Sequence, residues 1–382
     1  MITRRKFIIG TLPLTLSACT THDAFRIAQS VARGSSIEGA VTSQARSKAK
    51  GWVTNPQSLV NDVKRIDRFL SKVTSSWGDQ ENIKATPKEY VKYSDGYLSR
   101  ARINFDTGVV TVESLEPSRL KQLIVNTLLT PFNPELVDLF SDKGIPLGEV
   151  PFLYNQLHDN EGKAIRWEWR ADRFASYLLE RQLRSRSIID ASGKAQTLRY
   201  VEFPLLQNHS LKRKHKYSAY VERFAMQYGL APALVYAIIE TESNFNPYAV
   251  SWVPAYGLMQ IVPTTAGRDA FEFIHGYQGT PSSAYLFNIE NNIRMGCVYL
   301  HILNTRYLAK IRNPQSKEYS VIAAYNGGAG NVLRSFSSHK TEALKLINNA
   351  SPEQVWAVLR RNMPKESQSY LVKVTKAKKK YS

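Results

Sequence analysis

The spacing of apolar residues changes once along this 382-residue chain, close to residue 205, and that change limits the folds open to it. Upstream, alternating and helical patterns are mixed. Ile103 and Phe105 lead into the turn signal Asp-Thr-Gly at 106–108, and Val110 and Val112 follow it, which predicts two strands joined by a tight turn. Helical spacing predicts helices over 118–129 and 171–183, and two more strands are predicted on either side of 192–194.

Downstream of about residue 210 the strand signals vanish and helical spacing dominates. Helices are predicted over 211–228, 233–243, 263–273, 289–307, 320–336 and 352–362. The fold class is therefore α+β, with a small α+β N-terminal domain over 55–205 followed by a mostly α domain over 206–382. The basic run at 373–380 is expected to be a solvated tail.

The first residues are typical of an export signal rather than of a folded element. A basic stretch at 1–6 precedes an apolar run at 7–16 that is too short to span a bilayer. The sequence Leu-Ser-Ala-Cys at 16–19 resembles the lipobox of bacterial lipoproteins, which implies cleavage after a signal peptide over 1–18 and a lipid on Cys19, with a tether over 19–54. The alternative is a plain signal peptide with an incidental cysteine. The adjacent arginines at 4–5 leave the twin-arginine and general secretory routes both open.

The net charge indicates which kind of partner this chain binds. The chain carries 51 Lys and Arg against 32 Asp and Glu, a formal charge of +19, which favours an anionic partner such as nucleic acid, anionic lipid or acidic cell-wall polymer. An export signal makes nucleic acid the weakest of these. Cys297 lies in an apolar helical pattern and is expected to be buried and inert.

Several common chemistries find no motif in this sequence. No pair of histidines has the spacing of a zinc protease site, and there is no G-x-S-x-G nucleophile motif and no P-loop. The upstream domain has no Gly-rich phosphate loop and no metal-ligand cluster, so the sequence assigns it no chemistry. We expect neither a metal nor a cofactor.

One segment, 237–247, places a carboxyl where general-acid chemistry would need it. Val235, Ile238 and Glu242 fall on one helix face, so Glu242 is predicted at the C-terminal end of a buried stripe, whereas Glu240 points elsewhere and is expected to be solvated. Desolvation and the negative end of the helix dipole would both raise the pKa of Glu242, as a general acid near neutral pH requires. The alternative is a capping or exposed glutamate at a helix end.

A set of short motifs across the second half of the chain favours a functional role for the segment at 237–247. They are Glu-Ser at 242–243, Ser251, Gly-Leu-Met-Gln at 257–260, the helix at 291–300, Ala-Tyr-Asn-Gly-Gly at 324–328 and Glu-Ser-Gln-Ser-Tyr at 366–370. In this order they resemble the lytic murein transglycosylases, whose catalytic domain has a lysozyme-like (goose-type) fold. Segments 90–95, 103–106 and 151–154 are similar to the N-terminal domain of the membrane-bound type C members, so the resemblance covers almost the whole mature chain.

The resemblance implies a lyase reaction on peptidoglycan glycan strands. Glu242 would protonate the β-1,4 glycosidic oxygen between N-acetylmuramic acid and N-acetylglucosamine, and then take the C6 hydroxyl proton so that a 1,6-anhydro sugar closes. It further implies that Gln260 and Ser251 hydrogen-bond the sugar, and that Tyr325 lies close to the catalytic carboxyl. The substrate-binding set that it implies is Ser243, Ser251, Met259, Gln260, Tyr325, Asn326 and Tyr370. For the two tyrosines, a place in the core is the alternative, and it weighs more for Tyr370. Trp252 is expected to pack as a core aromatic.

The resemblance and the export signal together predict a monomer bound to the outer membrane, on its periplasmic face, through the lipid on Cys19. Thr20 favours the outer membrane because such lipoproteins use an aspartate at that position for retention in the inner one. Two rivals stay open: a lysozyme-type hydrolase of the same bond, in which water attacks, and a wall-binding lipoprotein without activity. Whether cleavage is endo or exo is left open.

Overall fold

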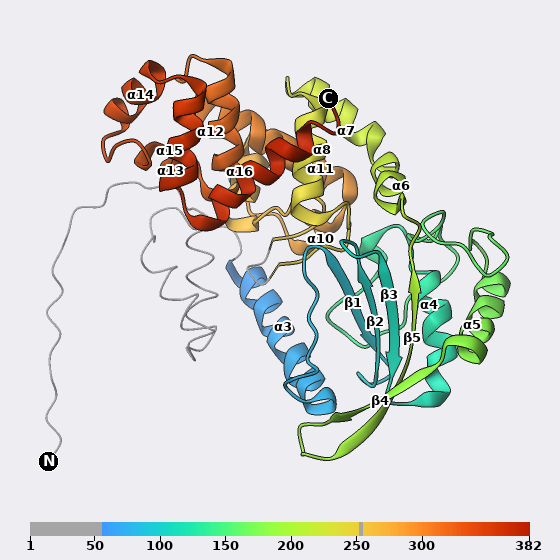
Figure 1. Ribbon diagram of the computed structural model, residues 1–382. Coiled ribbons are helices and arrows are strands. Elements are labelled where there is room, and N and C mark those ends of the chain that lie inside the picture. Colours follow the sequence, from blue (N-terminus) through green and yellow to red (C-terminus); the bar gives the residue numbers. More distant parts are fainter. Residues whose placement is uncertain (1–55, 252–254) are drawn as a thin grey trace, which may run out of the picture.

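The computed structural model describes residues 56–251 and 255–382, with side chains from residue 64 onward (Figure 1). The predicted signal peptide, the predicted lipid site Cys19, the predicted tether and Trp252 lie outside these residues. The chain forms a sheet-containing N-terminal half and a helical C-terminal half, so the predicted α+β class is confirmed. Among the described residues, no helix combines the length and apolar character needed to cross a bilayer.

The N-terminal half is built on a five-stranded antiparallel sheet with strand order β1-β2-β3-β5-β4. Its strands are β1 (Glu89–Ser94), β2 (Ser99–Asn104), β3 (Val109–Ser114), β4 (Arg184–Ile189) and β5 (Ala195–Pro204). Ile103 pairs with Val110 and Asn104 with Val109, which confirms the predicted strand-turn-strand. The predicted strands around 192–194 are also present, as the β4–β5 hairpin.

Helices cover both faces of this sheet (Figure 1). On one face α4 (Leu120–Leu128) packs against β2 and β3, and α5 (Glu168–Gln182) against β5. On the other face α3 (Pro56–Trp77) packs Phe69, Val73 and Trp77 against residues of β1, β4 and β5. Two short 3-10 turns, Pro117–Arg119 and Pro134–Leu136, complete this half. Helix α3 was not predicted from the sequence.

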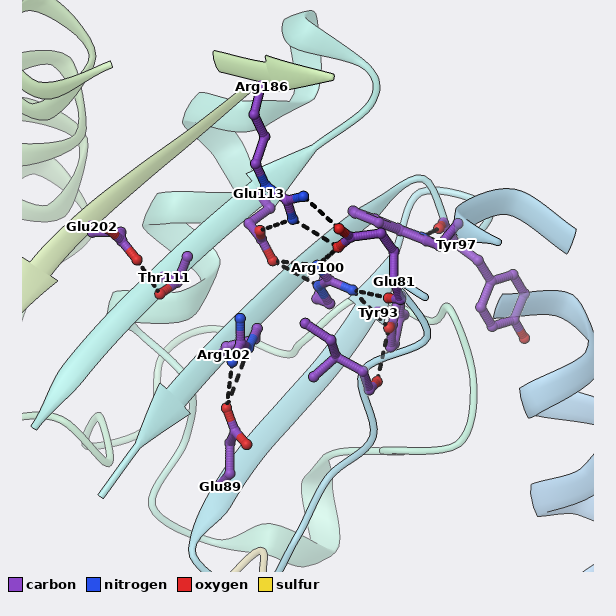
Figure 2. A network of polar contacts seen from close by, with 12 residues as sticks. Glu81, Glu89, Tyr93, Tyr97, Arg100, Arg102, Thr111, Glu113, Arg186 and Glu202 are labelled. Atoms are coloured by element: carbon purple, nitrogen blue, oxygen red, sulfur yellow. Dashed lines mark hydrogen bonds and ion pairs between the residues drawn. The ribbon is translucent and has the colours of Figure 1, made fainter. Parts of the chain in front are cut away.

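A partly buried network of charges lies between α3 and the sheet (Figure 2). The guanidinium of Arg100 has no exposed surface and forms an ion pair of 2.7 Å with Glu113. Arg100 also donates to the backbone carbonyl of Glu81 at 2.6 Å, and Arg186 donates to the Glu81 carboxylate at 2.7 Å. Because buried charges are stable only when paired, this network fixes the segment that leads into β1 against the sheet.

The C-terminal half contains helices throughout and no strand among its described residues. They are α6 (His209–Lys216), α7 (Ser218–Gln227), α8 (Pro232–Ser243), α9 (Arg268–His275), α10 (Ser283–Phe287), α11 (Ile289–Ile302), α12 (Pro314–Gly327), α13 (Ala329–Arg334), α14 (Lys340–Asn349), α15 (Pro352–Asn362) and α16 (Lys365–Lys378), with π-helical turns at Pro263–Gly267 and Leu303–Tyr307. The predicted helix over 320–336 is two helices, because Gly328, at φ +80°, ends α12. The helix predicted over 211–228 is likewise divided at Tyr217. Cys297 is buried in α11, as expected.

The expectation of a solvated basic tail at 373–380 is wrong. Most of this run belongs to α16, which buries Val374 and Ala377 against the rest of the domain. Lys378 forms an ion pair of 2.8 Å with Glu318 on α12. A lysine-rich run can therefore be a packed helix when its apolar residues share one face and its charges find partners on the other.

The two halves share one continuous apolar core. Tyr248, just beyond α8, packs edge-on against Tyr90 of β1 and Phe152, at ring distances of 5.1 and 5.9 Å. Its hydroxyl donates to the carbonyl of Pro131. The end of α8 is therefore fixed against the N-terminal half.

Candidate active site

Glu242 belongs to helix α8. This helix lies among the other helices of the C-terminal half (Figure 1). Pro232 occupies the first turn, where its missing N–H costs nothing, and every residue from Ala233 to Ile239 is buried. The helix packs against α7 and α16. It ends at Asn244 in the left-handed conformation, φ +48°, so Glu242 lies in the last turn, as predicted.

The carboxyl of Glu242 is poorly hydrated. The residue as a whole is half-buried, but protein atoms enclose the carboxyl, and this desolvation raises its pKa from 4.5 to about 8. The nearby carboxyl of Glu366 raises the pKa further, whereas contact with Tyr370 and the positive charge of Lys88 lower it. The predicted upward shift by desolvation is confirmed. At neutral pH this side chain holds its proton.

Two tyrosines from different helices face this carboxyl. Tyr325 of α12 donates its hydroxyl to the Met259 carbonyl at 2.9 Å, and Tyr370 of α16 brings its hydroxyl to Glu242 without the alignment of a full hydrogen bond. Both are buried, and burial followed by the proximity of Glu242 raises the pKa of each well above its usual value. Tyr370 is therefore both buried in the core and adjacent to the Glu242 carboxyl.

The loop at 257–261 is joined to the end of α8 and to α11. Ser243 donates to the Leu258 carbonyl at 2.8 Å, and Asn292 of α11 accepts from the Met259 N–H at 2.8 Å. Gly257 has φ +73°, and a Cβ there would lie 2.4 Å from the Asn292 amide nitrogen, so only glycine fits. These contacts hold the loop in one position.

Ser243 and Met259 are buried and hold the loop at 257–261 in place. Both side chains have no exposed surface. The Ser243 hydroxyl is used by the backbone, and the Met259 side chain packs so closely on Gly296 that a Cβ there would lie 2.2 Å from its sulfur. The contact of these two residues with a sugar, which the resemblance implied, stays a prediction.

The remaining predicted residues have polar groups at the edge of this region. Gln260, at φ +48°, donates to the carbonyls of Gly257 and Ala249 at 2.9 and 3.2 Å, and its buried Oε1 has no protein donor among the described residues. Asn326 accepts from Ser367 at 2.7 Å and donates to Glu366 at 3.4 Å. Ser251 is half-buried and lines a pocket that it shares with α3 and the segment 83–85.

The sequence assigned no role to two charged residues that the structure places near Glu242, namely Glu366 and Lys88. Glu366 stands one helical turn before Tyr370, a spacing that puts both on one face and could have indicated it. Nothing in the sequence connects Lys88, in the other half of the chain, with Glu242. The expectation that Glu240 is solvated is wrong, because Lys380 and Tyr381 both bind its carboxylate.

No group of three or more His, Cys, Asp or Glu side chains within 56–251 and 255–382 is arranged to hold a metal ion. The site therefore consists of one protonated carboxyl and the polar groups around it, which are two tyrosines, the amide oxygen of Gln260 and the charged side chains of Glu366 and Lys88.

Comparison with known proteins agrees with this arrangement. Residues 52–216 match the family described as membrane-bound lytic murein transglycosylase C, N-terminal domain, and residues 219–348 match the transglycosylase SLT domain. The membrane-bound lytic murein transglycosylase C of Klebsiella pneumoniae is 45% identical over 351 residues, which cover 89% of this chain and 96% of the relative. The chain belongs to the family of membrane-bound lytic murein transglycosylase C.

Other transglycosylase C relatives match at similar levels. The protein of Serratia proteamaculans is 45% identical, with 85% of this chain and 92% of the relative covered, and that of Yersinia pestis is 46% identical, with 83% and 88% covered. Among solved structures, the lytic transglycosylase Slt of Pseudomonas aeruginosa is 25% identical with a TM-score of 0.34, and covers 43% of this chain and 23% of its own. Glu242 and Tyr325 fall in the SLT match, and Lys88 falls in the transglycosylase C N-terminal match.

Proposed function

We propose that this member of the transglycosylase C family cleaves the β-1,4 bond between N-acetylmuramic acid and N-acetylglucosamine in peptidoglycan, and leaves a 1,6-anhydromuramic acid end. The observation that supports this most is the enclosed carboxyl of Glu242, whose pKa of about 8 keeps it protonated at neutral pH. Such a group is a general acid ready to protonate a glycosidic oxygen.

In the first step Glu242 gives its proton to the bridging oxygen, and the bond from that oxygen to C1 of the muramic acid breaks. The substrate's own N-acetyl group meets the positive charge that develops at C1, as in substrate-assisted glycosidases. In the second step the Glu242 anion takes the proton of the C6 hydroxyl, and the C6 oxygen bonds to C1 and displaces the oxygen of the N-acetyl group. The carboxyl ends as it began, and no water is consumed.

The groups around Glu242 have proposed roles in these two reaction steps. The Oε1 of Gln260, to which no described residue donates, would accept a hydrogen bond from the sugar, and Ser251 and Asn326 would contribute further polar contacts to the substrate. Tyr370 and Tyr325 would keep the carboxyl oriented while it exchanges its proton. Ser243 and Met259 would act by fixing the loop that carries Gln260.

Membrane attachment and organisation are proposed as well. The family name describes a membrane-bound protein, and we propose that a lipid on Cys19 holds this chain, as a monomer, on the periplasmic face of the outer membrane. The proposed divisions are a signal peptide over 1–18, a tether over 19–54, an α+β domain over 55–205 and the catalytic domain over 206–382. Cys19→Ala should abolish incorporation of labelled palmitate, and retained labelling would refute the anchor.

The product decides between this proposal and its rivals. Purified sacculi are digested with the wild-type protein and with Glu242→Gln, and the released muropeptides are weighed by mass spectrometry. We expect anhydro-muropeptides from the wild type and none from the variant. Products heavier by one water would indicate the lysozyme-type hydrolase, and no products from either would indicate a wall-binding lipoprotein.

A further inference from the structure

Lys88 is held at the edge of the N-terminal half by contacts on both its backbone and its side chain. Its carbonyl accepts from the Phe105 N–H at 3.0 Å, and its ammonium lies 3.6 Å from the Asp106 carboxylate. A backbone bridge between Thr86 and Glu89 closes the turn that carries it. About a third of the Lys88 side chain, 34%, stays exposed. Its position is therefore defined by the β2–β3 turn and not by a mobile loop.

The partly buried charge network fixes the segment upstream of Lys88 (Figure 2). Arg100 and Arg186 bind Glu81, and the Tyr93 hydroxyl donates to the Ile83 carbonyl at 2.8 Å. In Figure 2 Arg100 and Arg186 reach from the strands to Glu81, and Arg102 and Glu89 form a further ion pair of 2.9 Å at the end of the segment. The path from residue 81 to residue 89 is thus attached to the sheet at both ends.

The same edge docks on the residues that follow Glu242. Asn244, the cap of α8, donates to the Phe105 carbonyl at 2.8 Å and to the Asp106 carboxylate at 3.1 Å, and Asn246 donates to the Pro87 carbonyl at 3.1 Å. Asn244 lies two residues after Glu242. The contacts reach Asp106, which pairs with the Lys88 ammonium, and Pro87, which precedes Lys88 in the chain. They hold the turn that carries Lys88 against the residues that follow α8.

The docked backbone is strained, and buried side chains hold it. Asn244 and Phe245 both have positive φ, +48° and +61°, a conformation that a phenylalanine rarely adopts. The fully buried Arg213 donates to the Asn244 carbonyl at 3.1 Å, and the Tyr217 hydroxyl donates to that of Phe245 at 3.4 Å. Such strain persists only where the surroundings determine the conformation, and here both halves of the chain take part.

We infer that Lys88 is a positioning residue that the N-terminal domain supplies to the catalytic site. Its positive charge stabilises the Glu242 anion during the second proton transfer, and the negative charge of Asp106 partly offsets it. This inference rests on the proposed function. One carboxyl has to be an acid in the first step and a base in the second, and an enclosed anion beside the negative Glu366 needs a compensating cation.

The charges around the carboxyl agree with this role. The groups that interact electrostatically with it are Tyr325 from α12, Tyr370 and Glu366 from α16, and Lys88 from the N-terminal half, and Lys88 is the cation of this set. Desolvation and Glu366 raise the pKa of Glu242, and Lys88 lowers it. Removing the lysine charge should raise this pKa, and removing its partner Asp106 should lower it.

The test uses the full-length protein and the pH dependence of kcat/KM for release of anhydro-muropeptides from a soluble glycan chain. Because protonated Glu242 is the active form, activity falls on the alkaline side as pH rises through its pKa. Lys88→Met should move that alkaline limb upward, by roughly half a pH unit since the lysine is partly exposed and shared with Asp106. Asp106→Asn keeps the oxygen that accepts from Asn244 and should move the limb downward.

Lys121→Met is the matched control, since Lys121 forms an ion pair of 2.8 Å with Asp172 between α4 and α5, away from the catalytic helices (Figure 1). Its profile should superimpose on that of the wild type. Opposite shifts for Lys88→Met and Asp106→Asn support the inference, and unshifted limbs or shifts of the same sign overturn it. If Lys88→Met does not fold, Lys88→Gln and Asp106→Asn give the same two directions. A wild-type protein that releases no anhydro product refutes the proposed function instead.

Discussion

Replacing Glu242 by glutamine should stabilise the fold while it removes the acid. In the folded chain the carboxyl has a pKa of about 8, and in the unfolded chain it returns to about 4.5. Between these values the folded state binds a proton that the unfolded state has released, so the free energy of unfolding falls as pH rises through this window. Glutamine stays neutral in both states and escapes this loss.

The size of the effect follows from the two pKa values. One pKa unit corresponds to about 1.4 kcal/mol, so the advantage of Glu242→Gln is about 1 kcal/mol near pH 5 and at most about 4 kcal/mol near pH 8. The residual exposure of the side chain makes the larger figure an upper value. Above pH 8 both states of the wild type are ionised, and the advantage stops growing.

The assay is urea unfolding of the wild type and the variant across this pH range, with the difference in unfolding free energy plotted against pH. Taking the difference cancels every titrating group that the two proteins share. Glu240→Gln is the control on the same helix, because it removes an ion pair with Lys380 and should lower stability by about 1 kcal/mol or less throughout. A flat difference for Glu242→Gln would mean that the carboxyl is hydrated in the folded protein, and the account of the acid would then be wrong.

Three further predictions test the frame of the site. Asn292→Ala removes three buried hydrogen bonds from the loop at 257–261 and its neighbours and should lower the free energy of unfolding by about 3 kcal/mol in denaturant titration. Gly257→Ala should lower Tm by more than Gly276→Ala, because both glycines have positive φ but only the first has a neighbour within 4 Å of the added Cβ. Tyr370→Phe removes a contact that lowers the pKa of Glu242, so the alkaline limb of kcat/KM should move upward; a downward move would contradict that contact.

Much of the fold could be predicted because local patterns carry it. The β2–β3 hairpin follows from alternation around a turn signal, and α8 follows from apolar spacing between Pro232 and the Asn-Pro at 246–247. The periodicity also placed Glu242 in the last turn of α8, and desolvation of its carboxyl followed from the buried stripe beneath it. Some failures came from a single residue, as when Gly328 divides one predicted helix into two. Others came from distant packing, as when α16 buries Val374 and Ala377 of the basic run at 373–380.

The sequence by itself indicated Glu242 as the proposed acid and showed the motifs that accompany it, since both are contained in short stretches of chain. Only the tertiary structure decided what surrounds the acid. Lys88 approaches Glu242 from another half of the chain, Glu366 from a helix more than a hundred residues later, and Glu240 is covered by Lys380 and Tyr381. The reason is physical: periodicity records which face of an element is buried, whereas the charge on a buried group depends on which distant elements pack against that face.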